Sequence, residues 1–247
     1  MSFAAVDLGI LLPAFAAGLL VLATHVPLGG EVLRRGIIFI DLAIAQFAGL
    51  GIVVASALGF EASGWRMQLA AVLAALTGAL LLRALERCAP RQLEALIGVG
   101  FVTAACVAIA LMSHDPHAGE HLQELLVGQI LWSTWGDLGP LALVTAAVLV
   151  AWFALRLKDS PLGFYGLFAV TVTASVQVVG VYLVFASLIV PALAAGGRPG
   201  WAYAIGGAGY ALGLLASALL DLPAGAAIVL ALVAVAGSRS VLVGRRR

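Results

Sequence analysis

The chain has 247 residues, of which 63% are hydrophobic and 10% are charged, and its formal net charge is +1. Soluble domains are usually about 45–50% apolar and about 25% charged, so this composition excludes a soluble globular domain. The charged residues form no basic patch of the kind that binds nucleic acid, and we expect no nucleic-acid partner. The composition is typical of an integral membrane protein in contact with membrane lipid.

Nine apolar segments are predicted to be helices, because most of them approach the roughly 20 residues that cross a bilayer core. In chain order they are Leu8–Val26, Ile37–Gly59, Met67–Leu82, Leu93–Met112, Leu138–Leu157, Tyr165–Val179, Val181–Ala195, Trp201–Leu220 and Ala224–Leu242. The sequence therefore predicts an all-α fold, a polytopic membrane helical bundle with about eight or nine transmembrane helices. We assign residues 1–247 to a single transmembrane domain.

Basic residues predict which ends of these segments face the cytoplasm. They lie in alternate connections, at Arg34 and Arg35, at Arg83, Arg87 and Arg91, at Arg156 and Lys158, at Arg198, and at Arg245–Arg247. The positive-inside rule places these connections in the cytoplasm. We therefore expect a multi-pass protein of the plasma (inner) membrane, with its amino terminus outside and its carboxyl terminus in the cytoplasm.

This alternation holds only if residues 165–195 cross the membrane twice, with a turn near Gly180. Each half is shorter than a usual crossing, so we predict a discontinuous pair of helices. Such breaks occur where the backbone faces protein or a water-filled path. The alternative is one long helix, which would place the three carboxy-terminal arginines outside.

A second irregular segment is "LVGQILWSTWG", residues 126–136. It is apolar but too short to cross the bilayer and return, so we predict a re-entrant or interfacial segment. Trp132 and Trp135 suit the headgroup level of the membrane.

Three of the four histidines lie in one predicted external connection, "SHDPHAGEHLQELL", residues 113–126. A short helix here would place His117, His121 and Glu124 on one face, at spacings of four and three residues. Two imidazoles one turn apart can share a zinc ion with a carboxylate as third ligand, and His114 lies close by in the sequence. The alternative is a solvated connection that binds no ion.

Asp41 lies about one turn inside the second predicted helix, where a carboxylate is costly unless it faces water or the interior of a bundle. It is therefore a candidate residue of an ion pathway. The alternative is an interfacial ion pair with Arg34 or Arg35, two turns away. His25, at the predicted end of the first helix, has a weaker claim to function.

No pattern in the sequence indicates an enzyme. The phosphate-binding pattern GxxxxGK[ST] does not occur, and no nucleophile, base and orienting residue form a catalytic set. We expect no permanently bound cofactor.

Four stretches resemble a known family: "VPLGGEVLRRGIIFIDLAIAQ", "HLQELLVGQIL", "VTASVQVVGVYLVFASLIVPALAA" and "LLDLPAGAAIVL". Together they are similar to the membrane permeases of zinc and manganese ATP-binding-cassette importers, collinearly over nearly the whole chain. The resemblance implies a homodimeric channel that receives its ion from an extracytoplasmic metal-binding protein and is driven by a separate cytoplasmic ATPase. It also implies that Asp41 is a metal ligand, with a histidine one turn later.

The sequence departs from the family pattern at two places. The expected histidine falls at Ala45 or Gln46, and glutamine is a poor zinc ligand. The connection "RLKDSPLGF", residues 156–164, is shorter than the family's segment with the coupling helix that docks on the ATPase. The longer, amphipathic "RALERCAPRQLEA", residues 83–95, is a candidate substitute for that contact.

We therefore predict a permease subunit that moves divalent metal ions across the inner membrane, with Zn²⁺ as substrate ahead of Mn²⁺. Its predicted metal ligands are Asp41, His114, His117, His121 and Glu124. One alternative is a permease-like protein without an ATPase, acting as a metal sensor, scaffold or passive channel. A small-molecule permease of the same fold is a further alternative.

Overall fold

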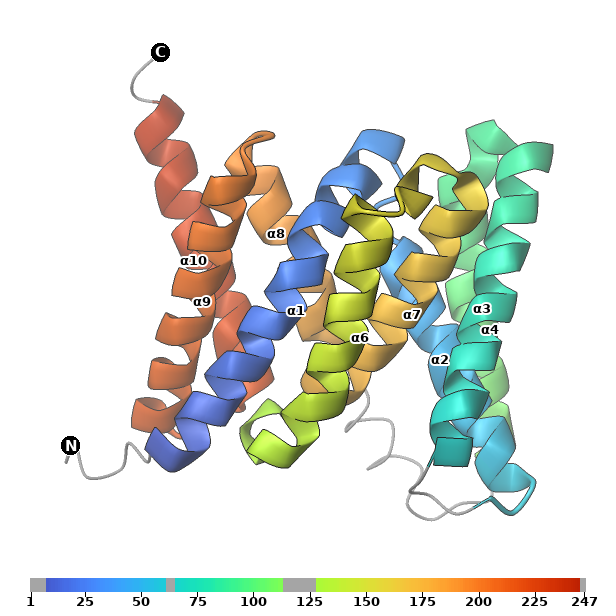
Figure 1. Cartoon of the computed structure of the whole chain (residues 1–247), viewed down its shortest axis with the longest axis horizontal. Coiled ribbons are helices and arrows are strands. Elements are labelled where there is room, and N and C mark those ends of the chain that lie inside the picture. The colour runs from blue at the N-terminus through green and yellow to red at the C-terminus, as the bar shows by residue number, and fades with distance from the viewer. Residues whose placement is uncertain (1–7, 61–64, 113–127, 245–247) are drawn as a thin grey trace. The chain divides into compact units, whose positions relative to one another are not determined.

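The computed structural model of the chain describes residues 8–60, 65–112 and 128–244, with side chains described as far as Arg239 (Figure 1). Nine α-helices and three short 3₁₀ turns make up the secondary structure of these ranges, and they contain no strand. The helices are α1 (Leu8–Arg35), α2 (Ile40–Ala57), α3 (Trp65–Cys88), α4 (Leu93–Leu111), α6 (Trp135–Phe153), α7 (Pro161–Val179), α8 (Val181–Ala195), α9 (Pro199–Leu220) and α10 (Ala224–Gly244). The predicted all-helical fold is confirmed.

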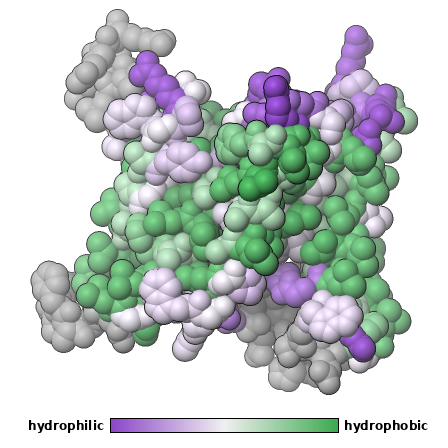
Figure 2. Space-filling view, in the orientation of Figure 1, coloured by the Kyte–Doolittle hydropathy of each residue, from purple (hydrophilic) through white to green (hydrophobic). Residues whose placement is uncertain are grey.

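Seven of these helices are long and apolar enough to cross a membrane, and the shorter apolar helical stretches are α8 and Ala224–Arg239 of α10. Figure 2 shows apolar side chains along the flanks of the helices and hydrophilic residues near their ends. Side chains such as Leu73, Leu143 and Leu230 are more than half exposed, which is the behaviour of residues that face lipid. The chain is a multi-pass membrane protein.

The first helix is longer than the sequence predicted. We expected it to end near Val26, but α1 continues through Pro27 to Arg35. Proline inside a membrane helix is tolerated when neighbouring groups satisfy the carbonyl that it leaves free. Leu28 and Val32, beyond the proline, are buried, so packing continues past it and sustains the helix.

The described chain forms two compact units. Unit 1 comprises residues 1–35, 126–147 and 175–247, and unit 2 comprises residues 36–125 and 148–174. In unit 1, α1, α8, α9 and α10 pack on one another. Gly18 of α1 lies against the ring of Tyr210 on α9, and Gly29 lies against the carbonyl oxygen of Leu188 on α8. Small residues allow this close approach, as is usual between membrane helices.

Unit 2 is built on α2, α3 and α4, with α2 packed against both of the others. The ring of Phe47 on α2 lies over Gly78 on α3, and Gly51 approaches the Ala74 side chain. In the same unit, the α6–α7 connection ends in an aromatic cluster, in which Phe164 contacts Trp152 at 6.5 Å between ring centroids. Its neighbour Tyr165 meets it edge-on at 5.4 Å.

The predicted break near Gly180 is confirmed. Helix α7 ends at Val179 and α8 begins at Val181, with Gly180 between them at φ 79° and ψ 164°. An L-residue rarely adopts this conformation, so glycine is required where the chain reverses. The backbone of Val179 and Gly180 also lies directly against Gly128, whose own φ is 70°. A Cβ on Gly128 would overlap that backbone.

The predicted re-entrant segment is described from Gly128 onward. Its described part contains a single helical turn, η3 (Ile130–Trp132), which is too short to enter a membrane as a helix. Ile130 is buried, whereas Trp132 and Trp135 are 79% and 63% exposed. An interfacial position for the two tryptophans stays a prediction.

Basic connections gather at one end of each unit. In unit 1, the carboxyl ends of α1 and α10 and the α8–α9 turn lie at the same end (Figure 1). In unit 2, the α3–α4 and α6–α7 turns also share an end (Figure 1). Within each unit, this is the arrangement that alternating crossings produce.

Candidate functional site

Asp41 lies in the first turn of α2 and is 1% exposed. The turn Gly36–Phe39 leads into this helix, and the Ile40 amide donates to the Ile37 carbonyl at 3.2 Å. Neither carboxylate oxygen of Asp41 accepts a well-formed hydrogen bond among the described residues, and its polar neighbours are the backbone N–H groups of Asp41 and Leu42. A buried carboxylate is strongly disfavoured unless a cation or a proton neutralises it, so Asp41 is a candidate ion ligand.

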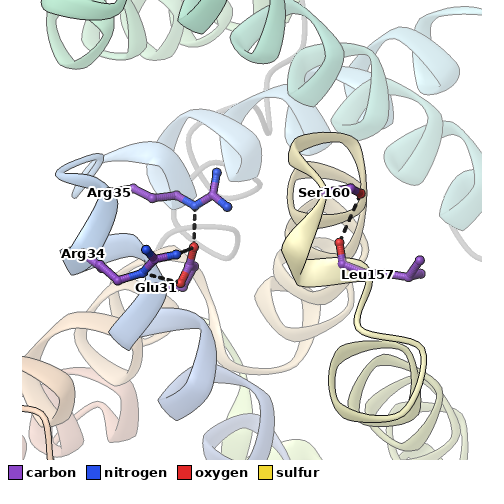
Figure 3. A network of polar contacts seen from close by, with 5 residues as sticks. All are labelled: Glu31, Arg34, Arg35, Leu157 and Ser160. Carbon is purple, nitrogen blue, oxygen red and sulfur yellow. Dashed lines mark hydrogen bonds and ion pairs between the residues drawn. The ribbon is translucent and has the colours of Figure 1, made fainter.

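The two arginines offered by the sequence as partners for Asp41 bind a different carboxylate. Arg34 donates from Nε to Oε2 of Glu31 at 2.9 Å, and Arg35 donates from Nε to Oε1 at 2.6 Å (Figure 3). Glu31 thus holds both cations at the carboxyl end of α1, within one turn of helix. The role of Asp41 as a residue of an ion pathway stays a prediction.

A second carboxylate lies near Asp41 within unit 2. Glu94 occupies the first turn of α4, and its Oε1 accepts a hydrogen bond from the backbone N–H of Phe39 at 3.2 Å. Its Oε2 is buried and has no hydrogen-bond partner in the described chain. This bond places the Glu94 carboxylate against Phe39, two residues before Asp41. Sequence reasoning overlooked Glu94, which there reads as an ordinary first-turn carboxylate.

No imidazole follows Asp41 on α2. Ala45, one turn on, is 4% exposed, and the next residue, Gln46, is half-buried. The described residues contain no group of three His, Cys, Asp or Glu side chains that could hold a metal ion.

His25 is fully buried in α1 and its hydrogen bonds are satisfied within unit 1. Its Nδ1 lies 2.8 Å from the Val21 carbonyl oxygen, to which it donates, and 3.2 Å from the Thr24 hydroxyl. Its Nε2 then accepts from the Ser175 hydroxyl of α7 at 3.4 Å. These contacts join α1 to α7 and give the residue a structural role, in line with its weak claim from sequence.

The predicted external metal ligands lie outside the described residues. His114, His117, His121 and Glu124 all belong to the stretch 113–127. Their helical arrangement and their metal binding stay predictions.

The connection 156–164 is short and tightly built. Its helical turn η4 (Leu157–Asp159) has three residues, and Arg156 before it has a left-handed φ of 53°. Arg156 donates from Nε to Oδ2 of Asp159 at 2.8 Å, and Gly163 packs against the Leu157 carbonyl. The Lys158 ammonium lies over the ring of Trp152, 5.8 Å from the ring centroid.

The stretch 83–95 is not the extended amphipathic loop that the sequence predicted. Helix α3 runs six residues past its predicted end at Leu82, as far as Cys88, and η2 (Pro90–Gln92) leads directly into α4. Arginine and leucine are good helix formers, which explains the extension. Arg87 and Arg91 are exposed there, whereas Arg83 is half-buried.

The chain was compared with known families and structures. The profile of the ABC 3 transport family matches residues 7–159 and 154–240, two ranges that meet at the α6–α7 connection. No curated protein matches the chain.

Two solved structures share the fold. PsaBC from Streptococcus pneumoniae in complex with Fab is 21% identical with a TM-score of 0.70, over 94% of this chain and 89% of that one. An inward-facing transporter described as a metal-chelate type ABC transporter is 18% identical with a TM-score of 0.64, over 89% and 82% of the two chains. Since the family profile covers nearly all of the sequence, the chain belongs to the ABC 3 transport family, as its resemblance to the permeases of metal-ion ABC importers implied.

Proposed function

We propose that the chain is the permease subunit of an ABC importer for divalent metal ions and itself catalyses no reaction. The observation that carries this proposal is the buried, unpartnered carboxylate of Asp41 in a member of the ABC 3 transport family. A carboxylate inside a membrane helix marks an ion path by default. The two compact units would then act as one permease domain over residues 1–247.

The proposed partners are a cytoplasmic ATPase, an extracytoplasmic metal-binding protein and a second copy of this chain. The fold shared with PsaBC, over most of both chains, supports this assembly. For the ion, the sequence favours Zn²⁺ ahead of Mn²⁺ because of the histidines of residues 113–126, and we propose that this ranking is set by that external connection. We also propose that the protein lies in the inner membrane with its amino terminus outside.

The ATPase contact provides the direct test of the proposed function. We expect it to depend on the exposed Arg87 and Arg91 at the α3–α4 turn, because η4 has only three residues and offers little helix for docking. Changing Arg87 and Arg91 to Glu should reduce co-purification of the ATPase by at least tenfold. The matched change is Lys158→Glu with Asp159→Lys at the α6–α7 connection, which should leave the complex intact.

The result also tests the orientation, since a cytoplasmic ATPase reaches these turns only if they face the cytoplasm. A complex that survives the arginine changes but is lost on changing Lys158 and Asp159 would move the contact to the short connection. If no ATPase encoded beside this chain co-purifies with the parent protein, the uncoupled alternative replaces the importer. The short η4 turn is the observation that favours that alternative.

The histidines of the external connection are proposed to collect ions for the path. Replacing His117 and His121 together with alanine should weaken uptake several-fold at scarce metal and leave it unchanged at plentiful metal. Neutral imidazole binds the ion, so capture should decline as the pH falls through the ordinary histidine pKa of about 6.5. Calorimetry with Zn²⁺ on the solubilised protein measures this directly. Equal Zn²⁺ affinity of the double variant and the parent would assign the stretch to a solvated connection.

A further inference from the structure

Three unpartnered carboxylate oxygens lie in the part of unit 2 where α2 and α4 begin. They are Oδ1 and Oδ2 of Asp41 and Oε2 of Glu94. Asp41 is 1% exposed, so water does not compensate for the missing hydrogen bonds. Two like charges placed together in a low-dielectric region repel each other, unless a cation or a shared proton neutralises them.

The packing of α2 on α4 places the Glu94 carboxylate beside the start of α2, close in sequence to Asp41. Helix α2 packs against α4, and the α2 end of this pair is fixed by the hydrogen bond from Phe39 N–H to Glu94 Oε1 at 3.2 Å. That bond uses one oxygen of Glu94 and leaves the other free. If Glu94 only capped α2, its Oε1 would be sufficient for that role. A second carboxylate nearby at Asp41 would not be needed.

The basic residues of unit 2 do not neutralise this pair by hydrogen bonding. The Nε of Arg83, on α3, is itself buried without a partner, and neither oxygen of Asp41 accepts a bond from it. The Lys158 ammonium lies over the ring of Trp152, and Arg156 forms an ion pair with Asp159. Within the described part of the unit, the carboxylate pair is thus left without a bonded counter-charge.

We propose that Glu94 acts with Asp41 as an oxygen-only subsite for the transported ion, taking the place of the imidazole missing at Ala45 and Gln46. This inference rests on the proposed function and names a second ligand for it. Two carboxylates with bound water suit a cation that must enter and leave, because a site with few protein ligands holds its ion weakly.

The chemistry of the donors has a consequence for selectivity. Oxygen ligands suit Mn²⁺ well, whereas imidazole and thiolate favour Zn²⁺. The Asp41–Glu94 subsite therefore accepts Mn²⁺ as well as Zn²⁺, and any preference for Zn²⁺ arises elsewhere in the chain. A histidine in place of Glu94 should shift the subsite toward Zn²⁺.

The test measures Mn²⁺ binding by electron paramagnetic resonance, using the full chain in nanodiscs with His114, His117 and His121 changed to alanine. Glu94→Gln is the informative variant, because the amide oxygen still accepts the bond from Phe39 N–H while the charge is lost. We expect Glu94→Gln and Asp41→Asn each to weaken Mn²⁺ binding at least tenfold. Asp159→Asn, which removes a half-exposed carboxylate paired with Arg156, should leave binding unchanged.

A second measurement compares the two ions at the same subsite. Competition with Zn²⁺ should give affinities within about tenfold for the parent, and Glu94→His should raise the preference for Zn²⁺ at least tenfold. Mn²⁺ binding by Glu94→Gln equal to that of the parent would overturn the inference and make Glu94 a cap of α2. An unchanged preference in Glu94→His would overturn it as well.

Uptake measurements separate this inference from the proposed function. If uptake needs Asp41 but Glu94→Gln transports and binds like the parent, the inference fails and the proposed function stands. If both variants lose Mn²⁺ binding while uptake continues, the proposed function stands and the inference fails, because the two carboxylates then bind an ion away from the transport path. If the parent protein itself takes up no metal, the proposed function fails whatever the two variants bind.

Discussion

Replacing Asp41 with alanine is expected to abolish metal uptake while the protein still folds and inserts into the membrane. The carboxylate is 1% exposed and its two oxygens accept no hydrogen bond in the described chain. Removing it therefore breaks no bonded partner. It also relieves an unsatisfied buried polar group, which typically costs about 1–3 kcal/mol. Thermal stability of the variant should equal or exceed that of the parent.

Two measurements together check this expectation. Metal accumulation reports the loss of uptake, and thermal unfolding of the purified protein reports stability. Glu31→Ala serves as a matched control, because it removes a carboxylate that holds Arg34 and Arg35. That control should lower stability without a specific loss of uptake per folded molecule. Normal uptake by a well-expressed Asp41→Ala variant would remove Asp41 from the ion path.

The second large effect is expected from Gly128→Ala. Gly128 has a φ of 70°, a conformation that costs an L-residue about 1–2 kcal/mol. A methyl group there would also overlap the backbone of Val179 and Gly180, and overpacking typically adds about 1–3 kcal/mol. We therefore expect a loss of about 2–5 kcal/mol of stability, together with reduced uptake, because the α7–α8 junction must shift.

Gly196→Ala is the control that separates the cost of backbone strain from the cost of steric overlap. Gly196 has a similar φ of 58°, but nothing lies within 4 Å of the position its Cβ would take. Its replacement should cost only the backbone strain, about 1–2 kcal/mol. Thermal unfolding of both variants in the same detergent gives the comparison. Equal destabilisation by the two changes would show that contact with the junction contributes nothing at Gly128.

Most of the fold follows from local properties of the sequence. Apolar runs located all nine helices of the described ranges, since most runs approach the length that a bilayer requires. The break at Gly180 was predictable because two independent signals agreed, the short length of each half and the alternation of basic connections. The end of α1 was missed because Pro27 is a strong stop signal in water, whereas membrane packing sustains the helix beyond it.

The candidate site was only half predictable. Asp41 stands out in the sequence because a carboxylate in an apolar run is costly wherever it lies. Glu94 does not stand out, since a first-turn carboxylate on a helix is common and its link to Phe39 spans 55 residues. Pairings at that separation depend on how α2 packs against α4. No local pattern contains that information.

The shortness of α8 has a consequence for how the protein fits the bilayer. With 15 residues at about 1.5 Å each, the helix is about 22 Å long, against a hydrocarbon thickness of about 30 Å. Such hydrophobic mismatch normally forces lipid to thin or a helix to oligomerise. Here Leu183, Ser187 and Leu188 are fully buried, so protein rather than lipid surrounds most of α8. Because these contacts are with protein, the short length of α8 imposes little hydrophobic mismatch on the surrounding lipid.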